Sequence, residues 1–347
     1  MGRKSRMELS FEVITKRLEL TNPWTISRGT AAHKEYCYLK LEKGPLTAWG
    51  EAAHNSRYGE SLDSVRAGLV SGVQLIRNHG VGAVAAAVVF AEAGIPRSAK
   101  AALDMALLDL EGQERGLTVR ALLGAPDTLP PATSFSIGID QLETIQAKVL
   151  AARDYKVLKI KLGTEQDAAI MQAVRAVTDQ PLRVDANEGW KDPETALRHI
   201  EKLAGQGVEL IEQPLPAGRL EEVAWLRERS PLPLFADEDV MDSADIPQLA
   251  AAYHGINIKL MKSGGPLEAW RMMLGAREHG LRIMLGCMIE SSCGISAAAH
   301  LSGAADFVDL DGHLLLAADP FTGLRLEEGR VRTGEAAGLG VRLGPGV

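Results

Sequence analysis

The second half of the chain repeats one pattern, in which a short aliphatic run is followed by an amphipathic stretch with helical spacing. Eight such runs follow residue 133, and we expect each to form a strand: 134–139, 157–162, 182–187, 208–214, 232–239, 256–260, 281–287 and 307–311. The stretches between them, such as 165–179 and 194–207, place apolar side chains at helical intervals. Strands that alternate with helices predict a parallel sheet, and eight of them predict a closed (β/α)8-like barrel.

The first third of the chain has a different pattern. Three segments alternate apolar and polar side chains like antiparallel strands: 7–20, 34–44 and 44–53. Three others have helical spacing and end in glycine: 61–80, 81–94 and 96–116. The last residues contain no good helical pattern and are expected to return to the N-terminal part. The predicted division is therefore an α+β domain over 1–125, a barrel over 126–319 and a C-terminal return over 320–347.

Composition excludes several classes of protein. The 347 residues carry a net charge of −7, so no basic excess points to nucleic acid or to an anionic membrane surface. The three cysteines, Cys37, Cys287 and Cys293, are too few and too scattered for a disulfide framework or a zinc site. The first ten residues lack the apolar core of a signal peptide, and no apolar run has the length of a membrane span. We expect a cytoplasmic protein.

Charged side chains stand where the predicted barrel strands end, which is where barrels of this kind carry their chemistry. Asp185, Glu212 and Asp237 come from three consecutive strands. Carboxylate oxygens spaced in this way suit a hard divalent ion that keeps coordination positions open for water and substrate. An alternative is that each carboxylate only pairs with a barrel lysine.

Two lysines, Lys159 and Lys161, interrupt the apolar run 157–162 and share one face of the predicted strand. Further lysines follow the sixth strand, so cations stand on both sides of the carboxylates. A metal between two lysines can hold a substrate carboxylate and stabilise the enediolate that forms when the α-proton leaves. We expect Lys161 to transfer the proton, and we expect the nearby charge of Lys159 to lower its pKa and help neutralise the enolate.

At these residues the sequence resembles the enolase superfamily, and specifically its muconate-lactonising subgroup. The motifs are "KIK" with Lys161, "DAN" with Asp185, "EQP" with Glu212, "ADED" with Asp237, and the lysine before "SGG", Lys262. The resemblance implies a (β/α)7β barrel under a capping domain built from the N-terminal third and the C-terminal tail. It also implies one Mg2+ per subunit on the three carboxylates, with Lys161 and Lys262 as opposed acid/bases.

The resemblance leaves one lysine in a supporting role. Lys259 and Lys262 have opposite parity, so a regular strand cannot aim both into the barrel. The family pattern selects Lys262 and leaves Lys259 as support. The His-Asp dyad of mandelate racemase fits poorly, because this strand offers lysine instead.

Other residues resemble those of dipeptide epimerases within the subgroup. Asp309 and Asp311 lie on one face of the last predicted strand, where that family holds the α-ammonium of a dipeptide. Segments 25–30 and 57–61 correspond to specificity loops of the capping domain, and Arg28 resembles the arginine that receives the side-chain carboxylate of glutamate. Supporting or unassigned residues complete the predicted site: Asn187, Glu238, Cys287 and Glu290.

The resulting hypothesis is an Mg2+-dependent isomerase that epimerises a dipeptide, with L-Ala-D/L-Glu from peptidoglycan turnover as the first candidate substrate and a homo-oligomer as the expected assembly. Alternatives on the same scaffold are an epimerase with another side-chain specificity, an o-succinylbenzoate synthase, an N-acylamino acid racemase or a muconate cycloisomerase. From other classes, a pyridoxal-phosphate racemase with Lys161 as the Schiff-base lysine leaves the carboxylates unexplained. A non-catalytic binding protein does not need lysines on both sides of a metal.

Overall fold

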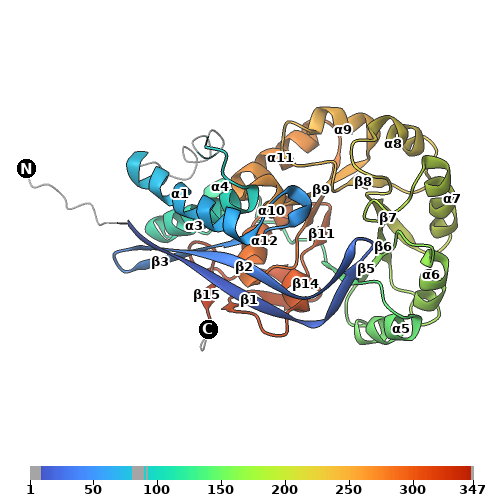
Figure 1. Cartoon of the computed structure of the whole chain (residues 1–347), viewed down its shortest axis with the longest axis horizontal. Helices are drawn as coiled ribbons and strands as arrows, with labels where there is room; N and C mark the ends of the chain where they lie inside the picture. Colours follow the sequence, from blue (N-terminus) through green and yellow to red (C-terminus); the bar gives the residue numbers. More distant parts are fainter. Residues whose placement is uncertain (1–8, 80–89, 91–92, 345–347) are drawn as a thin grey trace, which may run out of the picture.

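A computed structural model describes residues 9–79, 90 and 93–344 of the chain. The chain forms a barrel covered at one end by an N-terminal strand-and-helix domain, hereafter the cap (Figure 1). The expected helix over 81–94 lies almost wholly outside the described residues, as do most of the first ten residues. Within the described part, no helix combines the length and the apolar character needed to cross a membrane.

The barrel contains the eight predicted strands in one parallel sheet, in the spatial order β11–β10–β9–β8–β7–β6–β5–β4. A parallel bridge between Thr133 and Val308 joins the first strand region to the last, so the barrel is nearly closed. The strands are β4 Ser134–Ile137, β5 Val157–Lys161, β6 Leu182–Asp185, β7 Val208–Glu212, β8 Leu234–Ala236, β9 Gly255–Lys259, β10 Arg282–Gly286 and β11 Phe307–Asp309. The predicted fold class is confirmed.

Helices cover the outside of the barrel, as the ring from α5 to α9 shows in Figure 1. They are α5 Leu142–Ala151, α6 Asp167–Arg175, α7 Pro193–Ala204, α8 Leu220–Arg227, α9 Ile246–Ala252, α11 Pro266–Glu278 and α12 Ser292–Ala299. The short α10 Leu260–Ser263 is buried directly after β9. The start of α7 is fixed locally, because the Asp192 side chain accepts a hydrogen bond from Thr195 N and Pro193 occupies the first helical turn.

Strand β5 shows how the barrel turns charge inward. All five of its residues are buried, because helices cover one face and the barrel interior covers the other. The apolar side chains of Leu158 and Ile160 are 0% and 1% exposed and belong to the main hydrophobic core. Lys159 and Lys161 therefore point to the opposite, interior face of the same strand.

The cap is a three-stranded antiparallel sheet with helices packed against it. Its elements are β1 Leu9–Ile26, β2 Gly29–Lys43, β3 Leu46–Ala52, the short 3-10 helix η1 Ser56–Tyr58, α1 Leu62–His79, α3 Arg97–Arg115 and α4 Val119–Leu123. Helix α3 packs closely on β3, and a Cβ at Gly50 would lie 1.9 Å from the carbonyl oxygen of Ala102. Glycine is therefore required at this contact.

The C-terminal segment contacts the cap as well as the barrel. It contains β12 Phe321–Thr322 paired with β15 Arg342–Leu343, and β13 Arg325–Glu327 paired with β14 Arg330–Arg332. The 3-10 turns η2 Ser302–Ala304 and η3 Gly312–Leu315 lie before and after β11. The ring of Phe321 packs against Tyr38 and Trp49 of the cap sheet, with centroids 5.3 and 5.2 Å apart. Leu339 N donates a hydrogen bond of 2.9 Å to Asp109 of α3. The expected return therefore has physical contacts, while the exact domain bounds stay a prediction.

Candidate active site

Five adjacent strands present one charged side chain each at the same end of the barrel. In spatial order these are Lys161 of β5, Asp185 of β6, Glu212 of β7, Asp237 directly after β8, and Lys259 of β9. The parallel register places Lys161 beside Asp185 and Asp185 beside Glu212. The arrangement is therefore lysine, three carboxylates, lysine around one arc of the barrel mouth.

The three carboxylates form a compact acidic group with the geometry of a metal site. One oxygen from each of Asp185, Glu212 and Asp237 lies within 4.8 Å of the other two, and all three residues are at most 1% exposed. Glu212 Oε2 is buried without a well-aligned hydrogen bond, although the Lys159 ammonium is 2.6 Å away. Burial and the neighbouring Asp185 raise the pKa of Glu212 to about 8. This oxygen set fits a hard divalent cation.

Lys159 and Lys161 lie on β5 with their side chains toward the barrel interior, on one face as predicted. Their ammonium groups contact different carboxylates. Lys161 Nζ is 2.6 Å from Asp185 Oδ2 and lines the pocket. Lys159 Nζ lies deeper, 2.7 Å from Asp309 and 2.6 Å from Glu212. Burial lowers the pKa of Lys159, but the surrounding carboxylates outweigh burial and raise it well above its usual value. Lys159 therefore ties the acidic group to the eighth strand.

The structure resolves the parity problem at the sixth strand by ending the strand early. Strand β9 stops at Lys259, and Leu260–Ser263 form a helical turn, α10, so both lysines reach Asp237. Lys259 Nζ lies 2.7 Å from Asp237 Oδ2 and lines the pocket. Lys262 is 1% exposed and donates to Asp237 Oδ1 at 2.6 Å and to carbonyl oxygens of Asp237 and Val240. Among the described residues, the pocket lining includes Lys259 but not Lys262.

Asp309 and Asp311 both line the pocket, but they are not on one strand as predicted. Strand β11 ends at Asp309, and Asp311 follows it at the start of the turn η3. Asp309 accepts hydrogen bonds from Lys159 Nζ at 2.7 Å and from Ser134 Oγ at 2.6 Å. Asp311 accepts one from the backbone N of Ser136 at 2.6 Å. The Lys159 ammonium therefore compensates the charge of Asp309 inside the protein.

Two family models match the chain. The model described as "Mandelate racemase / muconate lactonizing enzyme, N-terminal domain" matches residues 9–124, and the model described as "Enolase C-terminal domain-like" matches residues 143–346. The L-Ala-D/L-Glu epimerase of Bacteroides thetaiotaomicron is 37% identical over 343 residues, which cover 98% of this chain and 89% of the relative. The chain belongs to the dipeptide epimerases of the enolase superfamily. It is therefore an isomerase.

Two further relatives show the range of the family. The L-Ala-D/L-amino acid epimerase of Pedosphaera parvula is 40% identical over 341 residues, which cover 94% of this chain and 96% of that protein. The dipeptide epimerase of Enterococcus faecalis V583, complexed with Mg and the dipeptide L-Leu-L-Tyr, superposes with a TM-score of 0.88 at 32% identity. That comparison covers 95% of this chain and 98% of the solved chain.

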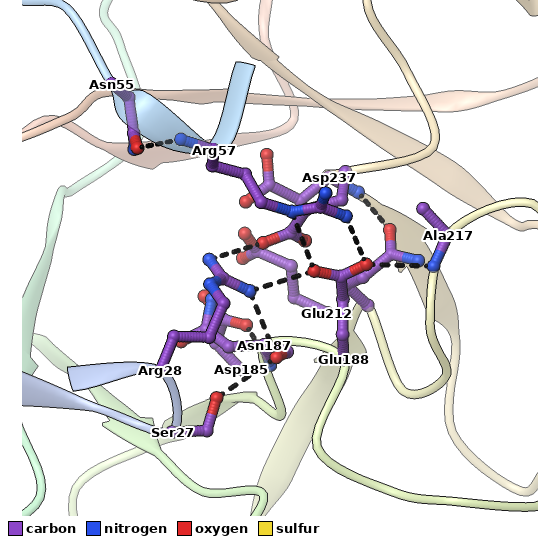
Figure 2. Close-up of polar contacts among 12 residues, drawn as sticks. Ser27, Arg28, Asn55, Arg57, Asp185, Asn187, Glu188, Glu212, Ala217 and Asp237 are labelled. Atoms are coloured by element: carbon purple, nitrogen blue, oxygen red, sulfur yellow. Dashed lines mark hydrogen bonds and ion pairs between the residues drawn. The ribbon is translucent and has the colours of Figure 1, made fainter. Parts of the chain in front are cut away.

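In this family member, an ion-pair network joins the cap to the barrel at the rim of the pocket (Figure 2). Arg28 Nη2 lies 2.8 Å from Glu238, and Arg28 Nη1 donates at 3.1 Å both to Glu188 and to the carbonyl oxygen of Asn187. Arg57, which the sequence analysis did not single out, binds the same Glu188 through Nε at 3.1 Å and Nη2 at 2.7 Å. Figure 2 shows both arginines converging on Glu188 close to the three carboxylates.

Glu238 is the buried end of this network. Its side chain is 1% exposed, and its Oε2 has no hydrogen-bond partner among the described residues. Burial and the nearby Asp237 and Asp185 raise the pKa of Glu238 to about 7, while Arg28 opposes the rise. Glu238 therefore holds the Arg28 guanidinium against the barrel.

The loops that follow β6 and β7 contain residues with unusual backbone conformations. Asn187, Glu188 and Gln213 have positive φ angles of 44°, 66° and 36°, which non-glycine residues adopt rarely. Gln213 uses its side chain to hold neighbouring strands together, because its Oε1 accepts from Asp237 N at 2.9 Å and its Nε2 donates to Asp239 at 2.9 Å. The strained loops follow directly after two of the candidate ligands.

The two unassigned residues after the seventh strand differ in position. Cys287 lines the pocket and its Sγ lies 3.3 Å from the carbonyl oxygen of Asp309. Glu290 is 1% exposed, accepts from Met288 N at 2.7 Å, and lies near the buried Glu51 of β3. Burial and Glu51 raise the pKa of Glu290 to about 8. Glu290 therefore belongs to the contact between cap and barrel.

Proposed function

We propose that the enzyme is an Mg2+-dependent epimerase that inverts the α-carbon of the C-terminal residue of a dipeptide. The observation that supports this proposal is the order lysine, three carboxylates, lysine on five adjacent strand ends. Inversion needs an acid/base on each face of a planar intermediate, and this order places one ammonium on each side of the proposed metal site. The relatives named as dipeptide epimerases support the substrate class.

Asp185, Glu212 and Asp237 would hold the Mg2+, since they offer buried oxygen ligands at metal-site spacing. When bound, the ion would accept the substrate carboxylate and stabilise the negative charge of the enediolate. The buried Glu212 Oε2 supports this assignment, because it lacks a well-aligned hydrogen bond and the Lys159 ammonium beside it is shared with Asp309. The carboxylates also hold the lysines in place until substrate arrives.

We assign Lys161 Nζ to one face of the α-carbon and Lys259 Nζ to the other. One lysine removes the α-proton, and the other returns a proton to the opposite face; the roles exchange for the reverse reaction. Burial lowers the pKa of Lys259, but Asp237 and Glu212 outweigh it and raise the pKa well above its usual value. With those carboxylates engaged by a divalent ion, the pKa of Lys259 would fall toward that of a useful base. Lys262, the family-pattern candidate, has the weaker claim because it lies behind Asp237.

Asp309 and Asp311 are proposed to receive the α-ammonium of the dipeptide. Asp311 is the freer of the two, since its side chain lies at the pocket and its contact is the backbone N of Ser136. L-Ala-D/L-Glu, a product of peptidoglycan turnover, remains the leading substrate. Arg28 stays a candidate for contact with the substrate side chain, although Glu188 and Glu238 already pair with it.

One observation favours a second specificity on the same scaffold. The pocket is also lined by apolar side chains from both cap and barrel, namely Trp24, Ile26, Met288, Ile289 and Leu315. These would suit a hydrophobic residue in the dipeptide. An epimerase for hydrophobic dipeptides is therefore the alternative, and the solved relative from Enterococcus faecalis, which is complexed with L-Leu-L-Tyr, supports it.

A single experiment tests the proposal. The enzyme is incubated in D2O with Mg2+ and a library of L,L-dipeptides, and mass spectrometry measures deuterium incorporation at the α-carbon. We expect exchange in one group of dipeptides, loss of exchange after EDTA, recovery with Mg2+, and poor exchange of the N-acetylated peptides. Full exchange in EDTA would refute the metal assignment. Equal exchange of free and N-acetylated peptides would refute the ammonium site and favour an N-acylamino acid racemase or o-succinylbenzoate synthase.

A further inference from the structure

The pocket contains one lysine whose charge has no partner among the described residues. Five cationic side chains line it: Arg28, Lys34, Lys159, Lys161 and Lys259. Four have a carboxylate oxygen in ion-pair contact, at 2.8 Å for Arg28, 2.7 Å for Lys159, 2.6 Å for Lys161 and 2.7 Å for Lys259. Lys34 has no ion-pair or hydrogen-bond partner within residues 9–79, 90 and 93–344. Burial lowers the pKa of Lys34, and no nearby carboxylate counteracts this effect.

Lys34 occupies a position that an apolar residue would suit better. It lies on β2 opposite Leu18, which is 4% exposed, and alternate residues of β2 on the same face, Tyr36 and Tyr38, are 3% and 0% exposed. A partly buried ammonium without a partner loses hydration and gains no compensating contact. A leucine or methionine would avoid this loss. The lysine therefore points to an anion that the described part of the chain does not supply.

The neighbouring side chains cannot supply that anion. His54, which also lines the pocket, is not an anion in either protonation state, and burial lowers its pKa. The four acidic side chains in the lining already have donors: Asp237 from Lys259, Glu238 from Arg28, Asp309 from Lys159 and Asp311 from Ser136 N. The anion that completes Lys34 must therefore arrive with a ligand.

We propose that Lys34 binds a side-chain carboxylate of the dipeptide and that it, rather than Arg28, makes the enzyme select acidic dipeptides. Arg28 is less suited to this role, because a substrate carboxylate would have to displace Glu188 or Glu238 from its guanidinium. The inference rests on the proposed dipeptide epimerase function. The carboxylate can belong to either residue of the dipeptide, and the experiment distinguishes the two positions.

The test compares isosteric acid and amide substrates, so that only charge differs. The first pair is L-Ala-L-Glu and L-Ala-L-Gln, and the second is L-Glu-L-Ala and L-Gln-L-Ala. We expect wild-type enzyme to prefer the acid by about 10- to 100-fold in kcat/KM in one pair, the scale of one charge-assisted hydrogen bond. Lys34→Met should reduce that ratio to about one, and Lys34→Arg should keep most of it. The pair that responds identifies which residue carries the carboxylate.

Controls separate charge at the pocket from general effects. Lys40→Met removes another lysine of β2, whose side chain pairs with Glu42. This variant should keep the wild-type ratio of kcat/KM between acid and amide substrates. The readout is a ratio of two kcat/KM values measured on one enzyme preparation, so a partial loss of folded protein does not change it. If Lys34→Met does not fold, Lys34→Gln replaces it in the same test.

The outcomes distinguish this inference from the proposed function. No acid preference in either pair, or a preference that survives in Lys34→Met but disappears in Arg28→Met, overturns the role of Lys34. In both cases dipeptides still exchange their α-proton, so the proposed epimerase function stands. If no dipeptide exchanges with wild-type enzyme, the proposed function itself has failed.

Discussion

At the scale of single residues, two lysines, Lys259 and Lys262, are candidates for the second acid/base of the proposed inversion. Lys259 ends β9 and lines the pocket, whereas Lys262 donates to backbone carbonyl oxygens behind Asp237. A buried ammonium that donates to carbonyl oxygens stabilises the fold, because its removal leaves those oxygens without a hydrogen-bond donor. The ammonium of Lys259 stands at the pocket wall, where a bound substrate can contact it. Substitution of Lys259 should therefore mainly affect catalysis, and substitution of Lys262 should mainly affect stability.

We expect Lys259→Ala to reduce epimerisation by at least about a thousandfold, on the scale of removing an essential acid/base. The variant should still exchange the α-proton of one stereoisomer with D2O through Lys161, which separates lost inversion from lost folding. Lys262→Ala should instead lower the melting temperature and reduce both exchange and inversion together. Chiral chromatography and mass spectrometry of the same reactions give both readouts. Retained inversion by Lys259→Ala with one-sided exchange by Lys262→Ala would return the role to Lys262.

At the scale of elements, the strands and helices of the barrel could be predicted, but the points where they end could not. Buried parallel strands are short apolar runs, and this pattern is visible in the sequence for all eight. The end of β9 is different, since "NIKLMK" is compatible with a strand through Lys262 or with a turn after Lys259. The same limit applies at the eighth strand, where Asp311 begins a turn. The residue at which such a strand ends depends on how the neighbouring elements pack against it, which the local sequence does not reveal.

Helix α3 of the cap and helix α11 of the barrel meet at a carboxyl group whose protonation should affect stability. Asp104 of α3 is 5% exposed, accepts a hydrogen bond of 2.8 Å from Leu267 N at the start of α11, and has no partner for Oδ1 among the described residues. Burial raises the pKa of Asp104 to about 7; the Leu267 N–H and Arg271 oppose the rise, and Glu268 adds to it. The folded protein therefore binds this proton more tightly than the unfolded chain does.

The sign of the effect follows from linkage. The stability that the raised pKa of Asp104 contributes is present below the unfolded pKa of about 4 and is lost as pH rises toward about 7. Asp104→Asn keeps an acceptor for Leu267 N and removes the titration. We expect the variant to be more stable than wild type at pH 8, by about 1 kcal/mol or more, and to lose this advantage near pH 4. Thermal melts across this range measure it, with the exposed Asp154→Asn as control; a constant difference at all pH values would contradict the prediction.

At the scale of the whole molecule, the site is shared between the cap and the barrel. Its candidate metal ligands and lysines come from consecutive barrel strands, and the sequence alone indicates charged residues at these strand ends. The ion pair between Arg57 and Glu188 at the rim of the pocket could not be predicted from the sequence, because the two residues are 131 positions apart and neither belongs to a periodic pattern. Arg57 holds η1 of the cap against the loop after β6, because it binds Glu188 of that loop. Ala217 N donates at 2.9 Å to Glu188 Oε1, the oxygen that also accepts from Arg57 Nη2. The contact therefore positions the cap over the pocket.

We expect Arg57→Met to raise KM about three- to tenfold while the melting temperature changes little. The Arg57 side chain is 40% exposed, and ion pairs of this exposure contribute about 0–1 kcal/mol to folding. The matched control is Lys43→Met, whose ion pair with Glu114 has similar exposure but lies wholly within the cap, so its KM should not change. Raising the salt concentration should increase the wild-type KM toward that of Arg57→Met, because partly exposed charges are screened. An unchanged KM in Arg57→Met, or an equal rise in Lys43→Met, would show that the pair does not position the cap for substrate binding.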